Sequence, residues 1–119
     1  MIEGSLYLND DHERPLLTHV MRTSTMLERM RGLLGRPVLE LDQGLLIISC
    51  SSIHTFFMRY PIDLVFLNKH WQIKKLVSVL KPWRMVWAPG TAMTLELRAG
   101  TIVRKRLALE STLVWEEHT

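Results

Sequence analysis

The chain has 119 residues, of which 47% are hydrophobic and 23% charged, and it contains one cysteine, Cys50. This length fits one domain, and the near-average composition excludes a largely disordered chain. A single cysteine excludes an intramolecular disulfide, and the apolar runs fall far short of the ~20 residues that cross a bilayer. We therefore predict one domain over residues 1–119, no membrane span and, without a visible signal peptide, a cytoplasmic location.

The net charge of +3 is unevenly distributed along the sequence. Residues 43–109 carry ten Lys and Arg side chains but only two acids, Asp63 and Glu96, whereas residues 1–42 and 110–119 are both net acidic. This asymmetry predicts a basic face that attracts anions or an acidic partner. It also sets the two acids of the central segment apart from the rest.

The first predicted elements are two strands and a helix. Residues 5–8 and 16–22 are typical of strands, and the polar residues 9–12 predict a turn between them. Thr25 and Glu28 match a capping box, which marks the start of a helix, and apolar residues follow at helical spacing. This is the single amphipathic helix that we predict, near the N-terminal third of the chain.

The rest of the chain is rich in apolar runs of strand length. Residues 50–61 and 81–91 show no clean period and predict irregular loops. Because strands outnumber helices and pair locally, we predict an α+β, mainly β fold, with a compact, largely antiparallel sheet or a barrel-like β domain. The further strands are predicted at residues 44–49, 62–67, 71–80, 92–98 and 112–116, and one or two helical turns at residues 100–106.

Asp63 is the polar residue that packing explains least. It lies in the run 62–67, where both strand faces are otherwise apolar, so the strand should be buried. An unpaired ionised carboxylate in such a place costs several kcal/mol. Asp63 must therefore have partners, which could be a basic side chain, backbone amides or a ligand. The structural alternative to a functional role is that it caps the preceding loop, through amides near Tyr60 or through Arg59.

Three other residues are candidates for chemistry. Glu96 lies in an alternating strand, where the solvated face of a sheet is the simpler interpretation. Cys50 and His54 lie four residues apart, which suggests a thiolate with a base, although a buried structural thiol is the alternative. His54, Asp63 and Glu96 are ligand types that suit a divalent ion, but no two of them share a motif spacing. We predict no metal site and no cofactor.

Cations and aromatic residues alternate in the central segment, as they do on platforms for single-stranded nucleic acid. Alternation places Trp71 on an apolar strand face, which favours a core position, so we do not predict nucleic-acid binding. Trp83, Arg84 and Trp87 are instead candidates for contact with a protein partner through the loop at residues 81–91. The alternative is that the two tryptophans close one end of a small core.

Four ordered motifs lie between residues 29 and 100, within a resemblance that covers residues 20 to about 115: Arg29…Gly32-Leu33-Leu34…Arg36, Gly44-Leu45-Leu46, His54…Met58…Pro61-Ile62-Asp63-Leu64-Val65-Phe66-Leu67, and Leu95-Glu96-Leu97…Ala99-Gly100. This set resembles domain-of-unknown-function family 192. The resemblance implies a small, mainly antiparallel β domain with a helix near its start and no agreed activity. It also implies that Met58, Asp63, Glu96 and Gly100 occupy hallmark positions. The form with Cys50 and Ile53-His54-Thr55 is similar to members encoded near pilus or secretion genes, and this similarity hints at partners.

Two functions of different classes remain open. The favoured one is a small binding or accessory domain without its own catalysis, linked to pilus, secretion or envelope processes.

The alternative is a small hydrolase or a metal- or anion-binding enzyme. In that enzyme His54 would act as general base, Asp63 would orient it or hold a cation, and Glu96 would complete the pocket. Arg36 or Arg59 would hold an anionic group. This hypothesis requires the two acids and the histidine to lie within reach of one another.

Overall fold

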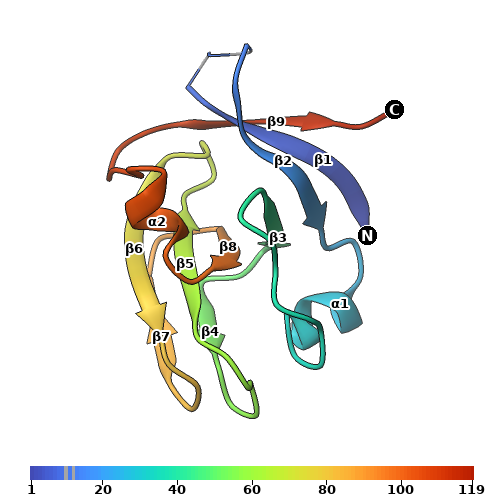
Figure 1. Cartoon of the computed structure of the whole chain (residues 1–119), viewed down its shortest axis with the longest axis vertical. Helices are drawn as coiled ribbons and strands as arrows, with labels where there is room; N and C mark the ends of the chain where they lie inside the picture. The colour runs from blue at the N-terminus through green and yellow to red at the C-terminus, as the bar shows by residue number, and fades with distance from the viewer. Residues whose placement is uncertain (10, 12) are drawn as a thin grey trace.

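Figure 1 shows a computed structural model of the chain, in which residues 1–9, 11 and 13–119 are described. Part of the predicted polar turn, Asp10 and His12, lies outside the described residues. The described elements are β1 (Ile2–Leu8), β2 (Pro15–Arg22), α1 (Met26–Arg31), β3 (Gln43–Ile48), β4 (Ser52–His54), β5 (Ile62–Leu67), β6 (Ile73–Leu80), β7 (Met85–Trp87), β8 (Met93–Arg98), α2 (Thr101–Arg104) and β9 (Leu113–Glu117).

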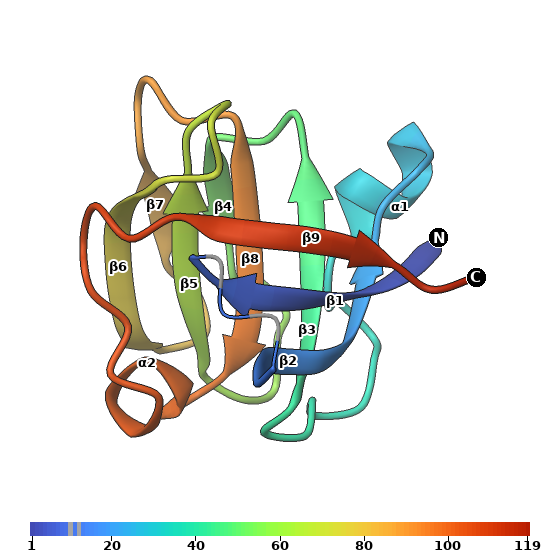
Figure 2. The same cartoon turned by 90° about the horizontal axis from the view of Figure 1, so that it is seen from above.

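Seven of the described strands form one curved sheet in the order β6-β5-β8-β3-β2-β1-β9 (Figures 1 and 2). Neighbouring strands are antiparallel except β2 and β3, which are parallel. The fold is therefore mainly β with a largely antiparallel sheet, as predicted. The sheet is not a closed barrel, because β6 and β9 are its edges among the described strands, and an isolated bridge between Gln72 and Thr112 links the chain next to them.

Strand β5 shows how the sheet divides the core. All six of its residues are buried, as the apolar run predicts. Alternation places Val65 and Leu67 in one hydrophobic cluster and Leu64 and Phe66 in the other. The second cluster is covered by residues outside the sheet, including Leu33 after α1. Both faces of β5 and β8 are therefore covered by protein.

Helix α1 begins at the predicted capping box. The Thr25 hydroxyl accepts a hydrogen bond from the Glu28 amide at 3.2 Å, and a Glu28 carboxylate oxygen accepts one from the Thr25 amide at 3.1 Å. The helix is short, because Gly32 follows it with a φ of 53°, outside the helical range. After Gly32 the chain leaves the helix and turns towards the sheet, where Leu33 packs in the second hydrophobic cluster.

The apolar side chains of α1 do not pack on the core. Met26, Leu27 and Met30 are 66–78% exposed, and no residue of α1 is buried. Only Leu33, which follows the helix, enters the second hydrophobic cluster. The helical spacing of these residues therefore marks an exposed apolar surface. No described helix has the length and apolar character that crossing a membrane requires.

Each of the two predicted irregular loops contains a short strand. Strand β4 lies within residues 50–61 and β7 within residues 81–91, and the two pair antiparallel as a separate two-stranded ribbon. Strands of three residues are too short to show an alternating pattern, so sequence could not indicate them. The buried Thr55 hydroxyl joins the loops beyond the ribbon, donating to the Lys81 carbonyl at 2.7 Å and accepting from the Arg84 amide at 2.9 Å.

Candidate functional site

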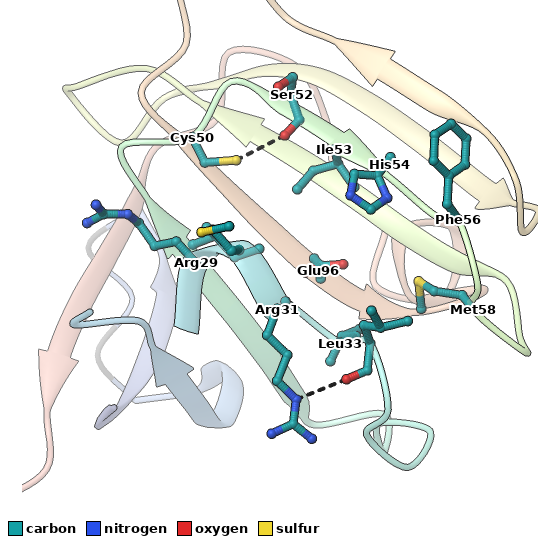
Figure 3. A pocket seen from close by; sticks show the side chains of 14 residues that line it. Arg29, Arg31, Leu33, Cys50, Ser52, Ile53, His54, Phe56, Met58 and Glu96 are labelled. Carbon is teal, nitrogen blue, oxygen red and sulfur yellow. Dashed lines mark hydrogen bonds between the residues drawn. The ribbon is translucent and has the colours of Figure 1, made fainter. Parts of the chain in front are cut away.

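A pocket of about 270 Å³ lies between the segment at residues 29–34 and strand β4 with the loop that follows it (Figure 3). Residues from four separate stretches of chain line it, so it exists only in the folded protein. Its polar lining includes Arg29, Arg31, Cys50, Ser52, His54 and Glu96, and its apolar lining includes Met30, Leu33, Ile47, Ile53, Phe56 and Met58.

Glu96 forms the floor of this pocket, near the centre of the lining side chains in Figure 3. On β8 it pairs with Leu45 of β3 and Leu64 of β5, so its side chain shares their face of the sheet. Glu96 is only 2% exposed, and its Oε1 atom has no hydrogen-bond partner within the described structure. The predicted solvated position is therefore wrong, because residues outside the sheet cover this face.

Burial raises the pKa of Glu96 from 4.5 to about 8, while the Leu33 amide and the Arg36 guanidinium act in the opposite direction. The carboxyl group is therefore mostly protonated at neutral pH when nothing else contacts it. A positive charge placed beside Oε1 would favour the ionised form instead. The floor of the pocket can thus change its charge in response to what it contacts.

Gly32 lies directly over Glu96. Its φ of 53° favours glycine, and a Cβ atom built on it would lie 2.8 Å from Glu96 Oε1. No role of Gly32 was predicted from sequence beyond its place in the first family motif. A glycine directly after a helical pattern was the available signal, although it indicates a helix end and says nothing about a distant carboxylate.

We expect Gly32→Ala to lower the free energy of unfolding by about 1–3 kcal/mol, from backbone strain together with the close approach to Glu96. Urea unfolding measures this loss. Gly90→Ala is the matched control, because Gly90 also has a positive φ, of 84°, but a Cβ there would meet nothing within 4 Å. Equal losses in the two variants would show that the contact with Glu96 has no energetic effect.

His54 and Cys50 line the same pocket as Glu96. The exposed His54 ring lies 5.0 Å from the ring of Phe56, measured between centroids. The half-buried Cys50 thiol donates to the Ser52 carbonyl at 3.1 Å. Within the described residues, the four-residue spacing thus does not produce a hydrogen-bonded thiol–imidazole pair.

Asp63 is fully buried and all its described partners are backbone amides. Its Oδ1 atom accepts a hydrogen bond from the Val79 amide at 2.8 Å. Its Oδ2 atom accepts from the Gly100 amide at 3.1 Å and the Ile102 amide at 2.8 Å. The prediction that this carboxylate has partners is confirmed, and they come from β6 and the start of α2 instead of the preceding loop. Asp63 therefore joins three separate segments.

The structure does not bring the three candidate residues together. In the pairing of β5 with β8, Asp63 lies opposite Leu97 and so faces away from Glu96. His54 and Glu96 share the pocket, whereas Asp63 lies on the other face of the sheet. No group of three or more His, Cys, Asp or Glu residues in the described ranges is arranged to hold a metal ion.

Arg36 and Arg59 line a neighbouring recess of about 440 Å³, which shares Leu33, Leu34 and Met58 with the Glu96 pocket. The Arg36 Nε atom donates to the Gly32 carbonyl at 2.8 Å. Arg36 thus supports the turn that carries Gly32 over Glu96. Both arginines therefore lie beside the candidate site.

The remaining predicted contact residues lie on or next to the β4–β7 ribbon. Trp83 is 55% exposed and Trp87 is 59% exposed, so these tryptophans do not close the core. Arg84 is exposed beside Trp83, and its backbone is held by Thr55. Trp71, in contrast, packs against the first hydrophobic cluster, as predicted.

These features define a small, mainly β domain with a carboxyl group at the floor of a largely apolar pocket. The family model of DUF192, described as "Uncharacterized ACR", matches residues 8–115. The chain therefore belongs to this family, as its ordered motifs predicted. No protein with a curated description matches the chain.

Two crystal structures have a similar fold. One is a protein named as a candidate transcription regulator from Sinorhizobium meliloti, which is 21% identical, with a TM-score of 0.82 over 95% of this chain and 93% of that one. The other is a protein of unknown function from Novosphingobium aromaticivorans, which is 17% identical, with a TM-score of 0.78 over 95% of this chain and 85% of that one. At these identities the likeness shows the fold alone.

Proposed function

We propose that this protein is a binding module for a small ligand, and that its site is the pocket over Glu96. The observation that carries this proposal is the Glu96 Oε1 atom, which is buried and unpartnered at the floor of the pocket. A buried polar atom without a partner destabilises the folded state. A ligand that supplies a hydrogen-bond donor or a positive charge would remove this destabilisation.

The lining indicates the class of ligand. Its walls are mainly apolar side chains, among them Phe56 and Met58, and Glu96 lies beneath them. The volume of about 270 Å³ lies just below the roughly 300–1,000 Å³ usual for drug-sized ligands. These features favour a compact amine with an apolar body, whose ammonium group would contact Glu96 and whose carbon skeleton would contact the walls.

A panel of simple amines tests this proposal. We expect n-butylamine, cyclohexylamine or benzylamine to raise the melting temperature of the protein, because they would bind only the folded state. The corresponding alcohols, which carry no charge, should have a smaller effect. Glu96→Gln should abolish the rise. Glu110→Gln should keep it, since Glu110 is exposed and pairs with Lys74. The proposal would be rejected if the amines raised the melting temperatures of Glu96→Gln and Glu110→Gln equally. It would also be rejected if they did not raise the melting temperature of the unaltered protein.

The pH dependence of amine binding is a sharper form of the same test. Below pH 8, Glu96 must release its proton before it pairs with an ammonium group, because its pKa is about 8. Amine affinity should therefore rise about tenfold per pH unit towards pH 8 and level off above it. Calorimetry in buffers of different ionisation enthalpy should detect release of nearly one proton at neutral pH. An affinity that does not change with pH would mean that Glu96 releases no proton when the amine binds, and loss of binding in Glu96→Gln would then decide whether Glu96 is the contact.

A second candidate is an acid–base enzyme that uses the same pocket. It is favoured by the raised pKa of Glu96, which suits a general acid near neutral pH, and by His54 in the same lining. In this form the hydrolase hypothesis keeps His54 and Glu96 but not Asp63. The chemical conversion of a bound ligand, followed by NMR and lost in His54→Ala, would favour this candidate over a binding module.

The proposed setting is an accessory role in a pilus, secretion or envelope process, which rests on the motif resemblance alone. A cytoplasmic location fits Cys50, whose thiol is free.

A further inference from the structure

Two neighbouring loops carry a cluster of aromatic rings, which we call the aromatic tip: the exposed Phe57 and Trp83 and the half-buried Phe56. Phe57 is 69% and Trp83 is 55% exposed, and their ring centroids lie 4.7 Å apart. Phe56 stacks on Trp83 with a centroid distance of 5.9 Å. The loops that follow β4 and precede β7 project from the lower end of the molecule in Figure 1. Exposed apolar groups of this kind mark interaction sites more often than scattered single residues do.

The backbone holds the aromatic tip in place. Phe57 has a φ of 66° and Trp83 a φ of 64°, values that bulky side chains seldom adopt. The Trp83 amide donates to the Thr55 carbonyl at 2.9 Å, and the Thr55 amide donates to the Arg84 carbonyl at 2.8 Å. Strained backbone persists only where its surroundings hold it, and such positions cluster at functional sites. The backbone hydrogen bonds between the two loops therefore help to hold the Phe57 and Trp83 rings in their exposed positions.

The surroundings of the aromatic tip are cationic. Arg59, Lys81 and Arg84 belong to the same two loops and are all exposed. Within residues 43–109, all of which the structure describes, the two acids are buried, with Asp63 0% and Glu96 2% exposed. No carboxylate of this segment therefore balances the positive charge at the surface. Acids from outside the segment pair with Lys74, Arg98 and Lys105, and no ion pair of the described residues involves the three cations beside the aromatic tip.

We propose that the aromatic tip docks on a membrane surface that contains anionic lipid. Aromatic rings would enter the boundary between headgroups and acyl chains, where such side chains are favoured. Arg59, Lys81 and Arg84 would contact lipid phosphates, and each cation near an anionic leaflet strengthens binding by about fivefold. Phe57, Trp83 and the three cations do not line the Glu96 pocket, whereas Phe56 does, so docking through them does not require the proposed ligand.

Two other anionic partners fit the geometry less well. A nucleic-acid base needs a free aromatic face, and the Trp83 ring already packs against Phe56 and Phe57. An acidic protein would need a cavity matching two protruding loops, whereas a fluid headgroup layer can close around them. The projecting shape therefore favours the membrane.

The experiment is vesicle binding by the full chain. Vesicles of phosphatidylcholine with about 30% phosphatidylserine should sediment with the protein, and phosphatidylcholine alone should bind far less. The double variant Phe57→Ala/Trp83→Ala should lose at least about tenfold in affinity, since two exposed rings would no longer enter the interface. Lys81→Gln and Arg84→Gln should each lose about fivefold. The melting temperature of each variant checks that it folds.

Leu27→Ala is the matched control, because Leu27 is a 78% exposed apolar residue on α1 and belongs to neither of the two loops that carry the aromatic tip. It should bind vesicles like the unaltered protein. The proposal is overturned if anionic vesicles do not bind, or if Leu27→Ala loses as much affinity as the double variant. Stronger binding to a single-stranded oligonucleotide or to polyglutamate, lost in the double variant, would also overturn it by identifying another partner.

Discussion

Asp63→Asn is expected to lower the free energy of unfolding by about 3–5 kcal/mol, which is a large fraction of the stability of a small domain. The carboxylate accepts hydrogen bonds from the amides of Val79, Gly100 and Ile102. Asparagine has one acceptor oxygen, and its NH₂ group must face at least one of these N–H donors. Because the site is fully buried, water cannot supply the missing acceptor.

Urea unfolding at neutral pH measures this loss. Asp42→Asn is the matched control, because Asp42 is exposed and forms a surface ion pair with Lys105 at 2.9 Å. Such pairs contribute only about 0–1 kcal/mol, so the control should remain close to the unaltered protein. If Asp63→Asn were as mild as Asp42→Asn, the three amides would have to find other acceptors. The proposal that Asp63 stabilises the fold by joining these segments would then be rejected.

The second large effect is a pH dependence of stability that Glu96→Gln should remove. Burial raises the folded-state pKa of Glu96 to about 8, above its ordinary value of 4.5. The folded state therefore holds this proton more tightly than the unfolded chain does. The resulting stabilisation is fully present below pH 4.5, falls as the pH rises and is lost by about pH 8. The total change is on the order of 3–5 kcal/mol.

Denaturant unfolding of the unaltered protein and of Glu96→Gln at pH 5, 7 and about 8.5 measures this effect. Other titrating groups contribute equally to both proteins, so the difference between them isolates Glu96. As the pH rises, the free energy of unfolding of Glu96→Gln should increase steadily relative to that of the unaltered protein. A difference that stays constant across this range would mean that Glu96 is already ionised in the folded protein. The amine proposal would then lose its predicted proton release, although amine binding itself could still be measured.

Much of the fold followed from local patterns. The apolar run of β5 predicted a strand buried on both faces, and the capping box predicted the start of α1. The apolar face of α1, however, is exposed to solvent. Helical spacing shows which residues share a face of the helix, but it does not show whether other residues cover that face. Strands β4 and β7 could not be predicted, because each has three residues and forms through its pairing with the other.

The candidate site was predictable only in part. Asp63 and Glu96 stood out from sequence as two acids in a basic region, but their roles turned out to be different. Asp63 is satisfied by backbone amides, whereas Glu96 keeps an unpartnered oxygen in a pocket. His54 shares the pocket with Glu96, which no spacing in the sequence indicated.

The sequence by itself determined the mainly β class, the burial of β5 and the requirement that Asp63 has polar partners. These follow from the alternation of side chains and from the energy of burying a charge, which act over a few residues. Only the tertiary structure decided that Asp63 and Glu96 face opposite sides of the sheet, through the register of β5 against β8. It also placed Gly32 over Glu96, a contact between residues far apart in the chain that no local pattern encodes.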